Sequence, residues 1–246
     1  MLRKIVLILT LLCSLAVANT AMGFNWQTAT VWNNSDGDQN WFNPNNWTHN
    51  GDQNEGTLPP DGNTFAIIEP YAGPIINGDA ACSALSVAHW SWSGAPIMAV
   101  EVQSGTFNAG EVILLSGGDN FAGDDPNGFG SAGLTVRGGT VTTPLLAGAG
   151  SGLRIGGGGS TFSMTNKGVV TMYGGLISVP RIALYNGNIY LYGGTLEYNY
   201  SDPCVQSGDP NFIFFQGYPE TKIDISGGTL RLKGNYSATS TYDPNL

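Results

Sequence analysis

The sequence predicts an all-β protein, a right-handed parallel β-helix or β-solenoid with a Trp- and Asn-rich N-terminal cap. Three observations predict it. Glycine supplies 36 of the 246 residues, about twice the usual frequency. A short strand-like phrase built around Gly-Gly recurs along the C-terminal two-thirds of the chain. No segment after the first 21 residues has the i, i+3, i+4, i+7 apolar spacing of an amphipathic helix.

The repeated phrase has two alternating apolar positions, a Gly-Gly pair and a further apolar position. Its copies are Leu134–Val141, Val170–Ile177, Ile189–Leu196 and Ile223–Leu230, with a degenerate earlier copy at Val100–Phe107. The leading glycines are 36, 19 and 34 residues apart, which we interpret as a coil of about 18 residues that is sometimes lengthened by an insertion. On this interpretation Leu153–Gly157 is the missing copy.

The alternation of side chains along a strand assigns the two faces of each coil. Leu134 and Val136 are expected to face the core, and Thr135 and Arg137 to face outward. Stacking one coil on the next, about 4.8 Å apart, buries the apolar face. Glycine is expected at the corners, with φ > 0 at the leading glycine of each pair, because the backbones of neighbouring coils approach closely there.

The domain organisation follows from three changes in composition. Arg3, Lys4 and the apolar run after them predict a secretory signal peptide over residues 1–21, and hence a secreted, extracellular or cell-surface protein. Residues 22–75, rich in Trp, Asn and Asp, are assigned to the N-terminal cap and the first strand. Residues 76–246 are assigned to the solenoid. The polar stretch 234–246 has no obvious cap, which indicates a shortened version of a longer solenoid.

The charge of the chain excludes some partners. Loss of Arg3 and Lys4 with the signal leaves seven basic residues against 18 acidic ones, a formal net charge of −11. Such a chain repels phosphate backbones, so nucleic acid is not an expected partner. No transmembrane segment is expected after signal removal. Cys82 and Cys204 are about six coils apart in the proposed register, too far for a disulfide.

A family resemblance rests on Trp41, on Asn46-Trp47, on Pro60-Asp61 and on the recurrent Gly-Gly-Thr-Leu phrases. With these features the chain resembles secreted bacterial β-solenoid repeat proteins, which are autotransporter-passenger-like and often joined to PEP-CTERM or dockerin tails. The resemblance covers nearly all of the mature chain and implies a cell-surface or extracellular solenoid, usually without a known activity. The sequence departs from this resemblance at its end, where we expect neither a sorting tail nor a dockerin.

Two acidic loops are candidate calcium sites. Asp119, Asp124 and Asp125 crowd one insertion, and oxygen-bearing side chains alternate over residues 34–40. Neither loop has the Gly and Glu positions of an EF-hand, and solvated turns are the favoured interpretation. No other cofactor is expected, because the Gly-x-Gly-x-x-Gly match at Gly128–Gly133 leads into a strand rather than a helix.

Two classes of function stay open. A structural or adhesive protein without catalysis is favoured; the alternative is a carbohydrate-active enzyme of the pectin-lyase type, either a polysaccharide lyase or a glycosidase. A lyase needs grouped basic residues and a glycosidase needs paired carboxylates. Arg137, Arg154, Lys167 and Arg181 are the basic residues of the central coils, and no repeated carboxylate pair accompanies them.

Tyrosine supplies the candidate ligand site. In the repeat register Tyr173 and Tyr192 take the same outward position on adjacent coils, and Tyr190 lies above Thr171. Rings spaced by one coil would stack on the sugars of an extracellular polysaccharide, or on one another as a stabilising ladder. The same two interpretations apply to the tryptophans of residues 26–47, where burial within the cap is favoured.

Overall fold

The computed structural model describes residues 29–49, 58–68, 72–87, 98–115, 131–144, 152–156, 167–199, 213–215 and 221–233. These residues form three sheets, here called A, B and C. The strands of sheet A are β1 (Thr30–Trp32), β2 (Trp47–His49), β3 (Phe65–Ile68), β6 (Ala84–Val87), β9 (Val112–Leu115), β12 (Gly152–Ile155), β15 (Ile182–Leu184) and β18 (Ile213–Phe215). Those of sheet B are β4 (Ile75–Ile76), β7 (Met98–Val102), β10 (Ser131–Val136), β13 (Lys167–Met172), β16 (Gly187–Leu191) and β19 (Lys222–Ile225). Those of sheet C are β5 (Ala80–Cys82), β8 (Thr106–Ala109), β11 (Thr140–Thr142), β14 (Leu176–Val179), β17 (Thr195–Asn199) and β20 (Thr229–Lys233).

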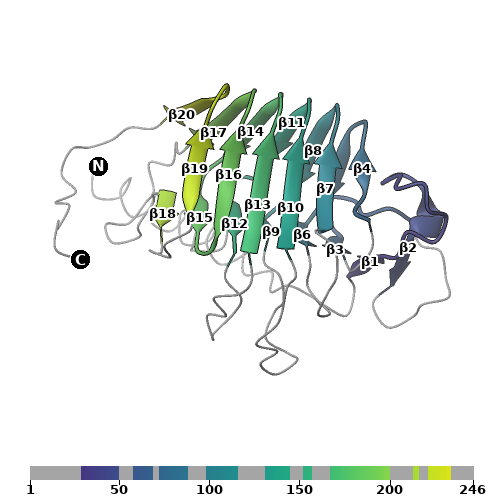
Figure 1. The fold of residues 1–246 in the computed structure, drawn as a ribbon. Coiled ribbons are helices and arrows are strands. Elements are labelled where there is room, and N and C mark those ends of the chain that lie inside the picture. Colours follow the sequence, from purple (N-terminus) through teal and green to yellow (C-terminus); the bar gives the residue numbers. More distant parts are fainter. Residues whose placement is uncertain are drawn as a thin grey trace, which may run out of the picture.

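The described chain is all-β, and its sheets are parallel apart from the β1–β2 pair. Its one helical element among these residues is the 3-10 turn η2 (Pro44–Asn46). Every third strand returns to the same sheet, so sheets B and C run β4-β7-β10-β13-β16-β19 and β5-β8-β11-β14-β17-β20. Figure 1 shows these strands side by side along one axis, from the cap to the C-terminal strands. This arrangement is compatible with the predicted β-solenoid.

Each coil contributes one strand to each sheet, which corrects the predicted coil length. The shortest coil places Gly168 opposite Gly187, 19 residues later, and a long one places Ser131 opposite Lys167, 36 residues later. The expectation that Leu153–Gly157 repeats the Gly-Gly phrase is therefore wrong. Leu153 belongs to β12, which pairs with β9 and β15 in sheet A and is the third strand of its own coil.

The predicted faces of the strands are confirmed. Leu134 and Val136 are fully buried, whereas Thr135 is partly exposed and Arg137 is exposed. Inward residues stack in columns along the axis; one column is Val102, Val136, Met172 and Leu191, all without solvent exposure. Each such side chain contributes about 1.5–3 kcal/mol of burial free energy, so the columns are the main source of stability.

At the corners Gly174-Gly175 and Gly193-Gly194 the two glycines serve different purposes. The left-handed residue is the second glycine, with φ of +71° at Gly175 and +72° at Gly194, so the prediction of φ > 0 at Gly174 and Gly193 is wrong. The leading glycine is needed for close approach instead. A Cβ at Gly174 would lie 2.5 Å from the Arg137 carbonyl oxygen of the preceding coil. Both positions exclude a side chain, one of them by conformation as well as contact.

The N-terminal cap buries its three described tryptophans, as expected. Trp32, Trp41 and Trp47 are at most 1% exposed and belong to the same core as the coils. Their rings meet edge to face, with centroids 5.0 Å apart for Trp32–Trp47 and 4.8 Å for Trp41–Trp47. Trp41 also packs on Phe107, so the cap covers the first end of the core.

Cys82 is a free, fully buried thiol on β5, and burial raises its pKa. Cys204 and Trp26 lie outside the described residues, as does the signal segment 1–21.

Candidate functional site

The three candidate tyrosines lie together on the outer face of sheet B, as the register predicts. Tyr190 is on β16 opposite Thr171 of β13. Tyr173 and Tyr192 directly follow β13 and β16, where each chain turns toward its Gly-Gly corner, and they are 51% and 49% exposed. Met172 and Leu191 point into the core. Tyr173 and Tyr192, which follow them, therefore point outward, because successive side chains of an extended chain alternate between the two faces.

The rings are stacked on one another. Centroids of Tyr173 and Tyr192 are 5.4 Å apart with planes at 24°, and those of Tyr190 and Tyr192 are 6.1 Å apart with planes at 6°. The Arg137 guanidinium lies over the Tyr173 ring at 4.8 Å, and the Lys222 ammonium lies over the Tyr190 ring at 5.2 Å. Arg137 and Tyr192 therefore both engage Tyr173, which favours the ladder over a flat platform for sugar rings.

Both cations of this group are held by carboxylates. Arg137 Nε is 3.0 Å from Glu101 Oε1, and Lys222 Nζ is 3.7 Å from Asp224 Oδ2. Asn188 Nδ2 donates to the Tyr190 hydroxyl at 3.3 Å. The group, here called the tyrosine row (Arg137, Tyr173, Tyr190, Tyr192 and Lys222), is thus charge-compensated. What it offers to solvent is the ring edges and phenol hydroxyls, which donate and accept hydrogen bonds.

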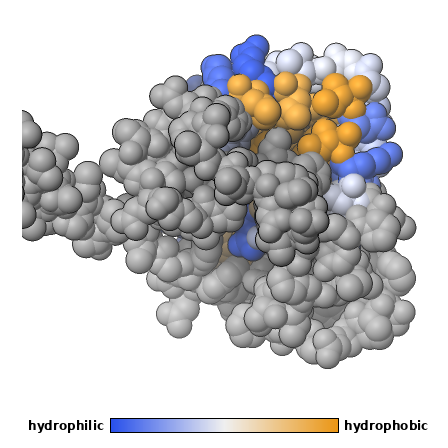
Figure 2. Space-filling model, turned by 90° about the vertical axis from the view of Figure 1, so that its left-hand side faces the viewer, coloured by the Kyte–Doolittle hydropathy of each residue, from blue (hydrophilic) through white to orange (hydrophobic). Residues whose placement is uncertain are grey.

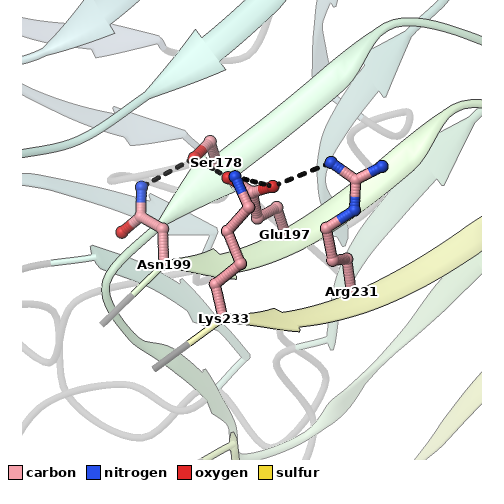
Figure 3. Close-up of polar contacts among 5 residues, drawn as sticks. All are labelled: Ser178, Glu197, Asn199, Arg231 and Lys233. Atoms are coloured by element: carbon pink, nitrogen blue, oxygen red, sulfur yellow. Dashed lines mark hydrogen bonds and ion pairs between the residues drawn. The ribbon is translucent and has the colours of Figure 1, made fainter. Parts of the chain in front are cut away.

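A second polar group lies on the outer face of sheet C and was not identified from the sequence. Figure 3 shows Glu197 between side chains of three strands. Ser178 Oγ of β14 donates to its Oε1 at 3.0 Å, and Arg231 Nη1 and Lys233 Nζ of β20 lie 3.1 and 3.0 Å from its Oε2. Asn199 Nδ2 donates to Ser178 Oγ at 2.6 Å. The register of the strands could have indicated this group, because Ser178, Glu197 and Arg231 occupy equivalent positions on three successive coils.

The environment of Glu197 favours its ionised form. The side chain is 7% exposed, and this burial alone would raise the pKa of the carboxyl. Hydrogen bonds from Lys233, Ser178 and Arg231 outweigh burial, so the pKa lies below its ordinary value. A carboxylate held in this way joins strands β14, β17 and β20 and is poorly suited to exchange protons with a substrate.

The basic residues considered for a lyase are dispersed. Arg137 lies at the end of β10 in sheet B, whereas Arg154 lies on β12 in sheet A, where its guanidinium covers the Tyr185 ring at 5.4 Å. Arg181 precedes β15 in sheet A. Side-chain contacts of Lys167 lie outside the described residues.

The loop of residues 34–40 uses its carboxylates internally. Asp36 Oδ2 accepts hydrogen bonds from Asn43 and Asn45, and Asp38 Oδ1 accepts one from Asn46 at 2.6 Å. A backbone hydrogen bond from Asn40, followed by the side chains of Asn43 and Asn46, lowers the pKa of Asp38. These contacts support a structural turn. Asp119, Asp124 and Asp125 lie outside the described residues, and within those described no three His, Cys, Asp or Glu side chains gather as a metal site.

No family model matches the chain, and neither do curated proteins or solved structures. Of the residues that the structure describes, none forms a helix long and apolar enough to cross a membrane.

Proposed function

We propose that this chain is a secreted, non-catalytic, right-handed parallel β-solenoid with a structural or adhesive role at the cell surface. The observation that carries the proposal is the continuous core enclosed by three mostly parallel sheets, together with the charge-compensated tyrosine row on the described outer face of sheet B. The right hand is expected because crossovers between parallel strands of one sheet are almost always right-handed.

The tyrosine row is proposed to stiffen sheet B and to contact a neutral extracellular polysaccharide. Stacking of Tyr173 on Tyr192 and of Arg137 on Tyr173 ties successive coils together outside the core. The half-exposed edges of the two rings present apolar carbon and hydroxyl groups, which suit the hydroxyl-rich surface of a sugar chain. A neutral chain is favoured over a uronide because the mature protein is strongly acidic.

The proposal of a non-catalytic role is supported by the charged groups of the tyrosine row and by Glu197. General acid–base chemistry needs a group that is free to take or give a proton near the substrate. Glu197 is fixed by two cations, and Arg137 is fixed between Glu101 and a tyrosine ring. Paired carboxylates at the separation used by glycosidases are not part of either group.

The experiment compares two substitutions at the tyrosines. The triple variant Tyr173→Phe, Tyr190→Phe, Tyr192→Phe keeps the stacked rings and removes the hydroxyls, whereas the triple Ala variant removes both. The Phe variant should unfold at the wild-type denaturant concentration and lose retention on immobilised neutral glycans. The Ala variant should lose stability as well, by about 0.5–1.5 kcal/mol for each lost ring pair. Thr135→Ala, on the same outer face, is the matched control.

The outcomes separate the proposed roles. Glycan retention by the Phe variant at the wild-type level would contradict contact through the hydroxyls. Wild-type stability of the Ala variant would contradict the stabilising ladder. Release of unsaturated uronides or of reducing ends from acidic or neutral glycans, abolished by Arg137→Ala, would overturn the non-catalytic role in favour of the enzyme.

A further inference from the structure

The described strands that lie farthest from the cap carry exposed apolar residues at inward positions. Strands β18, β19 and β20 are the outermost strands of their sheets on this side. Ile225 and Leu232 are 50% and 54% exposed, although their counterparts one coil earlier, Leu191 and Tyr198, are buried. Figure 2 looks onto this end and shows hydrophobic surface bordered by hydrophilic residues. We call this surface the open end; it is formed by Ile223, Ile225, Leu230 and Leu232.

The opposite end is closed by the cap. The backbone N–H of Ile75 on β4 donates to Gln39 O at 2.6 Å, and the N–H of Trp41 donates to Ile75 O at 3.2 Å. The cap thus takes hydrogen-bonding positions at the outer edge of β4, while Trp41 covers Phe107 beneath it. Within the described residues the cap therefore occupies the edge of β4 that a strand of a second molecule would need, which disfavours head-to-tail stacking of copies on sheet B.

The open end also presents backbone groups that earlier coils use. The carbonyl oxygens of Val102, Val136, Met172 and Leu191 each accept a hydrogen bond from the residue that begins the corner of the next coil. Ile225 is the register counterpart of Leu191, and no described strand lies beyond β19 to use its carbonyl. An edge strand with free backbone groups and an apolar layer beside it is a template for pairing with another strand.

We propose that the open end is an interface with a second copy of this chain, formed by antiparallel pairing of β19 with β19 of the other copy about a two-fold axis at Ile223. In this register Lys222 of each copy lies opposite Asp224 of the other. Both side chains are outward and about half exposed, so they are available to pair between copies. The interface covers both apolar layers and leaves a closed cap at each end of the dimer.

The charges of β19 select this register. Centring the pairing on Asp224 instead would place two Asp224 carboxylates opposite each other, and like charges directly opposite are destabilising. Pairing about Ile223 is self-complementary and places the apolar Ile223 side chains of both copies together. Self-complementarity of a single surface is what a two-fold interface requires.

The test uses charge reversal and light scattering coupled to size-exclusion chromatography, on the chain without residues 1–21. The wild type should be a dimer at tens of micromolar. Lys222→Asp and Asp224→Lys should each weaken dimerisation by about 10- to 100-fold, because each places like charges opposite each other twice. An equimolar mixture of the two variants should form a heterodimer, since the two acidic side chains on β19 of the first variant then face the two basic side chains on β19 of the second.

The mixture is decisive because neither variant can form the Lys222–Asp224 pair within its own chain. Dimerisation that returns in the mixture must therefore arise from contacts between copies. Urea unfolding of the monomeric variants is the control that they are folded. A monomeric wild type, or a dimer that neither variant weakens, would overturn the proposal. Dimerisation that appears only after residues 234–246 are deleted would also overturn it, because that segment would then be the occupant of the open end.

Discussion

Glycines at four positions separate the two reasons for which a coil needs glycine. At Gly175 φ is +71° and a Cβ would lie 2.6 Å from Gly139 O, so conformation and contact both exclude a side chain. Gly174 has only the contact, 2.5 Å from Arg137 O. Gly37 has only the conformation, φ of +70° with nothing within 4 Å, and Gly62 has neither.

Alanine at these four sites should therefore give a graded series of stability losses. The left-handed conformation costs a non-glycine residue about 1–2 kcal/mol. A Cβ forced against a fixed backbone oxygen costs about 1–3 kcal/mol, as other overpacking substitutions do. We expect the loss to be greatest for Gly175→Ala, intermediate for Gly174→Ala and Gly37→Ala, and absent for Gly62→Ala, which should stabilise by about 0.4–1 kcal/mol.

The assay is equilibrium urea unfolding, with the midpoint compared at constant slope. If Gly175→Ala and Gly62→Ala unfold at the same urea concentration, the stacking of corners on one another is not the origin of the Gly-Gly phrase, and the reasoning fails. If Gly174→Ala and Gly62→Ala change the stability equally, close approach of neighbouring backbones is not the reason for glycine at position 174.

Three further predictions concern single side chains. The pKa of Glu197 is lowered in the folded chain, so its pairing stabilises the fold fully above the unfolded pKa of about 4.3, and this contribution is lost as the pH falls through the folded pKa. Glu197→Gln should therefore flatten the dependence of the urea midpoint on pH below about pH 5, and an unchanged dependence would contradict the pairing. Cys82 is buried with a raised pKa, so it should react with a thiol reagent only when the protein unfolds. The labelling is measured in the Cys204→Ser variant, which lacks the other thiol, and fast labelling of the native protein would contradict the burial of Cys82. Trp41→Ala should cost about 3–5 kcal/mol in urea unfolding because it uncovers Phe107, and a loss below about 1 kcal/mol would show that the cap does not seal the core.

The strand positions could be predicted from the sequence, but the length of a coil and its number of strands could not. The Gly-Gly phrase marks the corner between sheets B and C, so it located Val136, Met172 and Leu191 correctly. Spacing cannot distinguish one long coil from two short ones, since both return the chain to the same register. Leu153 and Ile155 alternate and precede glycine in the same way as residues of sheet B, although they pair in sheet A.

The candidate site was predictable in position but not in orientation. Register alone placed Tyr192 beside Tyr173, and spacing by one coil fits both a flat platform and a stacked ladder. The ladder depends on χ angles and on Arg137 at the ring face, which a strand pattern does not determine. The group around Glu197 is not indicated by a pattern of paired carboxylates, because the partners of Glu197 are the cations Arg231 and Lys233 on the next coil.

The stacking of three-strand coils is tested most directly by a distance along the axis. Spin labels at Glu101→Cys and Asp224→Cys, with Cys204→Ser, occupy one outward column of sheet B, separated by four steps through Thr135, Thr171 and Tyr190. Four steps of about 4.8 Å predict a separation of about 19 Å by pulsed electron paramagnetic resonance. If the coil were instead about 18 residues long, the same labels would be about seven coils apart, and a distance of about 33 Å would contradict the account.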